Sequence, residues 1–115
     1  PWEDQIYSIW GTASDDIWAV GANGQVAHYD GTEWTSLDLE LPITFRGVYG
    51  RASDDVFIVG NQGFAMHFDG EELTKVETGS VATLYSIDGD GKDQIVVVGD
   101  LGTVLNVVWI PDDEE

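Results

Sequence analysis

The sequence predicts an all-β fold that is built from repeated units of 39 residues. The segment 9–34 returns in altered form at 48–73 and at 87–109, with an offset of 39 residues and no gap. Glycines recur with the same offset, at 11, 50 and 89, at 21, 60 and 99, and at 24, 63 and 102. Apolar residues alternate over segments that are too short for helices. A period of about 40 residues filled with short strands is typical of β-propeller blades.

The first unit contains four predicted strands, at 6–10, 17–20, 25–29 and 33–37. Turn-forming residues fill 11–16. Asn23-Gly24 and Asp30-Gly31 predict hairpins, because these residues tolerate a positive φ. The strand at 17–20 is continuously apolar, which indicates burial on both faces and suits a blade that is stacked between two others.

The second unit repeats this plan, with strands at 45–49, 56–59, 64–68 and 72–76. The third unit keeps three strands, at 84–87, 95–98 and 103 to about 108. Its fourth strand would come from 111–115, where a proline and four acidic residues predict a poor strand. We therefore predict a single propeller segment with antiparallel blades at about 6–39, 45–78 and 84–110, the third incomplete, and an acidic tail at 111–115.

The charge balance excludes some partners. The chain has 22 acidic and four basic residues, and its formal net charge is −18. Such a charge opposes binding to nucleic acids and to anionic membranes, and it permits a basic protein partner. No apolar run is long enough to predict a transmembrane helix, and without cysteine no disulfide framework is expected. Nothing in the sequence indicates a compartment.

The acidic residues gather in two of the three turn sets of each unit. Blades whose strands run alternately up and down place these two turn sets at the same end, so one pole of the molecule should be strongly negative. The turns between first and second strands carry Asp15, Asp16, Asp54, Asp55, Asp90 and Asp93, and those between third and fourth strands carry Asp30, Glu33, Asp69, Glu71 and Glu72.

No catalytic residues are predicted. His28 and His67 occupy the same repeat position, which Asn106 takes in the third unit. A histidine beside a carboxylate can act as a general base or a ligand. Recurrence with the blade period favours a structural role instead, because catalytic groups are not expected to repeat with every blade. The sequence shows no Ser-His-Asp spacing, phosphate loop or zinc pattern, so we expect no enzyme activity and no cofactor.

Two sets of residues are candidate ligand sites. Asp88, Asp90 and Asp93 are spaced like the start of a calcium loop, but the distal glutamate is absent and Lys92 interrupts, so an ordinary turn is favoured. The less acidic pole carries amides and a carboxylate that suit a sugar site beside an exposed aromatic ring, or that merely shape hairpins. These residues are Asn23, Gln25, Asn61, Gln62 and Asp100.

The first unit resembles tectonin-type and tachylectin-like propeller repeats, in which a VWAVG-like strand precedes a glycine hairpin, an aromatic strand and a DGxxW turn. The matching residues are 17–21, Asn23-Gly24, 26–29 and Asp30-Gly31 with Trp34. The second unit matches without the tryptophan, and the third matches only at 95–99 and Gly102. Some of these families are lectins. The resemblance therefore implies carbohydrate binding as the alternative to a non-enzymatic binding or scaffold module.

Three blades do not close a ring, since propellers contain about four to eight. The 115 residues nearly equal three periods of 39, so one chain could follow another head to tail without breaking the repeat. We expect a homodimer with six blades first and a homotrimer with nine blades next. The remaining alternative is that the chain is a fragment of a longer propeller.

Overall fold

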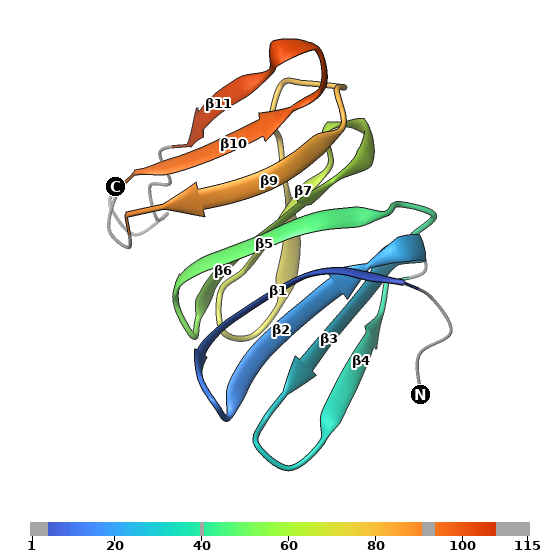
Figure 1. Ribbon diagram of the computed structural model, residues 1–115. Coiled ribbons are helices and arrows are strands. Elements are labelled where there is room, and N and C mark those ends of the chain that lie inside the picture. The colour runs from blue at the N-terminus through green and yellow to red at the C-terminus, as the bar shows by residue number, and fades with distance from the viewer. Residues whose placement is uncertain (1–4, 40, 91–93, 108–115) are drawn as a thin grey trace.

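The computed structural model describes residues 5–39, 41–90 and 94–107, which form three antiparallel sheets (Figure 1). Neighbouring strands in each sheet are consecutive in the chain. Blade one contains β1 (Ile6–Ala13), β2 (Asp16–Gly21), β3 (Gln25–Tyr29) and β4 (Trp34–Asp38). Blade two contains β5 (Phe45–Ala52), β6 (Asp55–Gly60), β7 (Ala65–Phe68) and β8 (Leu73–Val76). Blade three contains β9 (Leu84–Gly89), β10 (Ile95–Gly99) and β11 (Val104–Val107).

The predicted strands are present, and the first strand of each of the three blades is longer than predicted. β1 continues to Ala13, where the sequence predicted a turn from Gly11 onward. A β-bulge between Gly11 and Ala13 lets the strand continue, so that only two residues connect it to Asp16. The predicted acidic tail at 111–115 lies outside the described residues.

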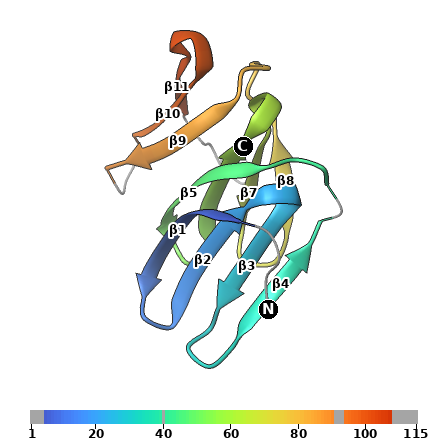
Figure 2. The same cartoon turned by 45° about the vertical axis from the view of Figure 1, so that its right-hand side comes forward.

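The three sheets follow one another like segments of an arc (Figures 1 and 2). β1 contacts β5, and β5 contacts β9, so the first strands of the blades form one continuous inner edge. β4 and β8 are the strands farthest from that edge in their sheets. Among the described residues, no helix is long and apolar enough to cross a bilayer.

Two apolar layers hold the blades together. Between blades one and two, Trp18 and Val20 pack with Val48 and Ile58. Between blades two and three, the members of the layer are Phe57, Val59, Leu84, Ile87 and Val97, together with Tyr49, Ala65 and Ile95. Neighbours in β6 belong to different layers, so this apolar strand is buried on both faces.

A short 3₁₀ turn follows the second strand of every blade: η1 (Ala22–Gly24), η2 (Asn61–Gly63) and η3 (Asp100–Gly102). The first two turns lie against the segment that leads to the next blade. A Cβ at Gly24 would approach the Leu41 carbonyl oxygen to 2.6 Å, and one at Gly63 would overlap the Ser80 carbonyl. Glycine is needed here both for this close approach and for the positive φ.

Candidate functional site

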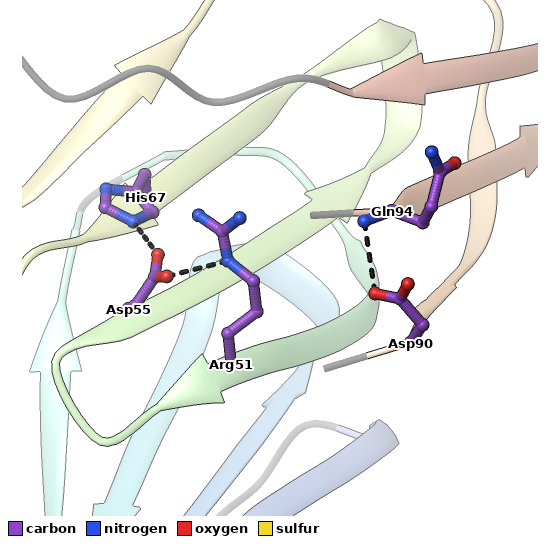
Figure 3. Close-up of polar contacts among 5 residues, drawn as sticks. All are labelled: Arg51, Asp55, His67, Asp90 and Gln94. Carbon is purple, nitrogen blue, oxygen red and sulfur yellow. Dashed lines mark hydrogen bonds and ion pairs between the residues drawn. The ribbon is translucent and has the colours of Figure 1, made fainter. Parts of the chain in front are cut away.

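Each of the first two blades contains an Asp–His pair that joins its second strand to its third. His28 Nε2 lies 2.6 Å from Asp16 Oδ1, and His67 Nε2 lies 2.6 Å from Asp55 Oδ1. The other carboxylate oxygen of Asp55 accepts a hydrogen bond of 2.7 Å from Arg51 Nε (Figure 3). In blade one, the Thr12 hydroxyl takes this place and donates to Asp16.

Aromatic rings cover both histidines. The centroids of His28 and Trp18 are 4.8 Å apart, and those of His67 and Phe57 are 4.5 Å apart. Burial disfavours ionisation of Asp16, but the hydrogen bonds from His28 and Thr12 outweigh it and hold the pKa of this carboxyl below its usual range. The pairs therefore fasten neighbouring strands in the way expected of a repeated structural element.

Blade three replaces both members of the pair with amides. Gln94 stands at the position of Asp55, and the exposed Asn106 stands at that of His67. The Gln94 backbone N–H donates to Asp90 Oδ1 over 3.1 Å (Figure 3). Asp90 holds the turn in this way, which is a local structural role.

The calcium candidates cap their own turn. Asp88 Oδ1 accepts a hydrogen bond of 2.8 Å from the Gly89 N–H, and Asp90 accepts the one from Gln94. Asp93 lies outside the described residues. Within the part of the chain that the structure describes, no group of three or more His, Asp or Glu side chains is arranged to hold a metal ion.

The five predicted ligand residues lie in or beside the 3₁₀ turns. Asn23 and Gln62 are exposed and adopt φ angles of 57° and 62°, so both have a conformational role. Gln25 Nε2 donates to Ser36 Oγ on β4 over 2.8 Å, away from the inner edge. The exposed Asp100 donates its N–H to the Thr83 carbonyl. Asn61 contacts the inner edge, because its Oδ1 accepts a hydrogen bond of 2.8 Å from Arg46 Nε.

The inner edge carries a group of residues that the sequence interpretation missed. Tyr7, Arg46 and Tyr85 are 39 residues apart, near the start of β1, β5 and β9. Each falls at a break in strand register, between Ile6 and Ser8, between Phe45 and Gly47, and between Leu84 and Ser86. A β-bulge leaves one residue unpaired and redirects its side chain. All three blades thus carry the same bulge at the same place.

The three bulged side chains lie together, and we call them the Tyr–Arg–Tyr ladder. Arg46 Cζ is 5.1 Å from the centroid of the Tyr7 ring and 5.3 Å from that of the Tyr85 ring. These distances are within the range of cation–π attraction. β5 lies between β1 and β9, so each tyrosine reaches the guanidinium from a different neighbouring blade (Figure 1). The ladder depends on a difference between the repeats, because blade two has arginine where blades one and three have tyrosine.

Arg46 differs from the other described basic residues. Arg51 is paired with Asp55, and Lys75 Nζ lies 3.8 Å from a Glu77 oxygen. Within the described ranges, no carboxylate lies within 4.0 Å of Arg46. Arg46 is half-buried and is held at Nε by Asn61, and its two terminal nitrogens form no hydrogen bond with another described residue.

The acidic turns lie at the opposite pole, as predicted, in blades one and two. A Cβ at Gly31 would lie 2.8 Å from Asp15 Cβ, and one at Gly70 would lie 2.9 Å from Asp54 Cβ. The two turn sets of a blade are therefore adjacent. Asp69 accepts backbone hydrogen bonds from Glu72 and Glu71, which lower the pKa of its carboxyl, and Asp30 is held in the same way.

Stacked four-stranded antiparallel sheets, with their first strands along one inner edge, define the β-propeller blade fold. A solved structure described as "YCF48 bound to D1 peptide" is similar to 92% of this chain, with a TM-score of 0.75 and 17% sequence identity. The chain covers 38% of the length of that protein. No protein-family model matches the sequence. A comparison with curated proteins also finds no match.

Proposed function

We propose that this chain is a non-enzymatic β-propeller binding or scaffold module, and that a second copy completes its ring. The observation that carries the proposal is a contrast in exposure between equivalent positions. Apolar residues that are buried between blades inside the chain are exposed where the same repeat position falls on an end blade.

Both ends show this contrast. On the free face of blade one, Ile9 is 63% exposed, whereas its equivalent Val48 is 5% exposed. On the free face of blade three, Val98 is 41% exposed, and the equivalent Val59 is 2% exposed. Val104, also in blade three, is 61% exposed. Exposed apolar surface of this kind marks an interaction site.

The turns of the blades support the same conclusion. Gly24 and Gly63 lie against the segment that enters the next blade, whereas no described residue lies within 4 Å of a Cβ at Gly102. Blade three therefore offers the surface on which the entry segment of another blade fits. Because the contacts between blades one and two and between two and three use equivalent positions, the free face of blade one complements that of blade three. Such heterologous contacts close into a ring. Two copies give six blades, and three copies would give nine.

Sedimentation velocity with two variants tests this assembly. We expect a dimer for the natural sequence, and monomers for Ile9→Asp and for Val104→Asp, since each damages one face. A mixture of the two variants should give a heterodimer, because one interface then joins two intact faces. Thr74→Asp on the exposed side of β8 is the control and should remain dimeric. A natural chain that stays monomeric at micromolar concentration refutes the ring, as does a mixture that fails to associate.

Carbohydrate binding of the tectonin type is the alternative function. The exposed rings of Tyr7 and Tyr85 contact Arg46, which in turn is bound by the amide of Asn61. Aromatic faces near an amide suit a sugar. A glycan array tests this alternative, and the absence of protein binding to any glycan on the array would remove it.

The similar structure is described as bound to a peptide, which is in keeping with a binding role. The acidic pole suits a basic protein, and we propose no nucleic-acid or membrane partner.

A further inference from the structure

We infer that the Tyr–Arg–Tyr ladder is a binding site for a single carboxylate group, such as an acidic side chain or the C-terminus of a peptide. This deepens the proposed binding role by naming a ligand class. It rests on that role, and it does not depend on the closure of the ring.

Among the residues that the structure describes, no carboxylate pairs with the charge of Arg46. In a chain with a net charge of −18, a basic residue readily finds a carboxylate, as Arg51 does with Asp55. Arg46 instead contacts one neutral amide and two tyrosine rings. Tyrosine faces attract a cation but do not neutralise it. Since no described carboxylate takes this place, an anion from outside the chain suits it.

The geometry favours a planar, singly charged anion. The Nε–H of Arg46 is bound by Asn61, so the terminal nitrogens present the remaining edge of the guanidinium. This edge matches the two oxygens of a carboxylate in a bidentate pair. Arg46 Cζ lies close to the rings of both Tyr7 and Tyr85, so a ligand that meets this edge is also near the two rings. The strongly negative chain also disfavours ligands with several charges more than it disfavours one carboxylate.

The position of the ladder makes it accessible to a ligand. Tyr7 is 45% exposed and Tyr85 is 46% exposed. By contrast, Phe45 and Leu84, which directly precede Arg46 and Tyr85 in their strands, are buried. The strand starts lie beside η1 and η2, at the pole opposite the acidic turns. A carboxylate that approaches Arg46 therefore avoids the most negative part of the surface.

Side-chain NMR of the two arginines provides the test, because the chain contains only Arg46 and Arg51. Acetate is titrated against sodium chloride of equal ionic strength, and the Nε–H signals are followed. We expect the Arg46 signal to shift, and the signal of the already paired Arg51 to stay in place. A short neutral peptide with a free C-terminus is then compared with its C-terminal amide and with an amidated peptide that contains one aspartate.

Arg46→Tyr is the matched variant, because tyrosine already occupies this position in both other blades. We expect it to fold, to keep the oligomeric state of the natural chain, and to bind the preferred peptide about 10- to 100-fold more weakly, as loss of a charge-assisted hydrogen bond implies. Asn61→Ala should weaken binding less, since it only frees the orientation of Arg46. Isothermal titration calorimetry measures both affinities.

Three results would overturn the proposal: no Arg46 shift with any carboxylate, equal binding by Arg46→Tyr, or tighter binding of inorganic phosphate than of acetate. The oligomeric state is measured on the same samples. A monomer that binds carboxylate through Arg46 would therefore refute the ring and keep this site. A dimer without carboxylate binding would do the opposite.

Discussion

His67 Nε2 and Asp55 Oδ1 are 2.6 Å apart in blade two, and the histidine is almost completely buried. The same bond in blade one joins a half-buried His28 to Asp16. Blade three has neither residue, because Gln94 and Asn106 stand in their places. The fold therefore accepts two chemical solutions at one position, which makes the energetic role of the pair measurable.

Replacing Asp55 with alanine should lower the free energy of unfolding by about 1–3 kcal/mol, because a buried imidazole then loses its carboxylate acceptor. Urea unfolding at pH 7 measures the loss. Asp54→Ala changes the exposed neighbouring carboxylate and is the control, with an expected effect within about 0.5 kcal/mol. The double change Asp55→Gln and His67→Asn copies blade three. It should cost less than the two single changes added together, and strict additivity would show that the pair does not act as a unit.

The turn at Asp69 predicts a dependence of stability on pH. Its carboxylate accepts N–H bonds of 3.0 Å from Glu72 and 2.9 Å from Glu71, which lower its pKa from 3.8. Because the pKa of Asp69 is lower in the folded chain, its ionised carboxylate stabilises the fold at pH values above the ordinary pKa of 3.8. This stabilisation is lost as the pH falls through the pKa of the folded chain. The melting temperature of the natural chain should therefore exceed that of Asp69→Asn at pH 7, and the difference should shrink toward about pH 3. A difference that does not change with pH would rule out this role.

Gly63 and Gly102 separate the effect of steric overlap from that of backbone conformation. Their φ angles are 71° and 72°, but only Gly63 has a carbonyl, that of Ser80, in the space of a Cβ. Gly102→Ala should cost about 1–2 kcal/mol for the left-handed backbone alone. Gly63→Ala should cost clearly more, because the segment that enters blade three must move. Thermal unfolding compares the two variants, and equal losses would mean that this segment is not packed on η2.

Leu101 has a backbone conformation that suits asparagine. Its φ is 58° and its side chain is 99% exposed, at the position that Asn23 occupies in blade one. Leu101→Asn should raise the free energy of unfolding by about 1 kcal/mol, because asparagine tolerates the left-handed region. Val81→Asn, at an apolar side chain of 90% exposure outside that region, is the control and should change little. If both changes stabilise equally, removal of exposed apolar surface is the cause.

The adjacent acidic turns predict that salt stabilises the assembly. Like charges closer than a Debye length of about 10 Å repel at 0.1 M salt, and closure of the proposed ring would bring the negative poles of two chains together. We expect the apolar faces of the proposed dimer to outweigh this repulsion, so the dimer should persist at low salt and its melting temperature should rise as salt increases. Scanning calorimetry from about 10 to 300 mM sodium chloride measures the change. A melting temperature that falls instead would show that favourable ion pairs dominate.

The sequence repeat was enough to predict the fold, but the most distinctive side-chain contacts could not be predicted from it. Hairpin residues such as Asn23 and Gly24 recur with the period, so strands and turns could be placed before any coordinates. The pairing of His28 with Asp16 spans a hairpin, and it becomes evident only when the register is known. The Tyr–Arg–Tyr ladder gave no signal, because all three positions share only a backbone irregularity and the arginine of blade two interrupts the recurrence of tyrosine. A bulge adds one residue and leaves the surrounding sequence pattern intact.

The glycine contacts of the 3₁₀ turns also bear on the order of folding. The Gly24 N–H donates to the Ile43 carbonyl, so the turn of blade one is completed by the segment that enters blade two. A blade that leaves the ribosome is thus unfinished until the next one begins. Its own strands pair locally, and coupling between blades extends only to nearest neighbours. Synthesis from the N-terminus therefore adds stability stepwise, because each blade secures the one before it.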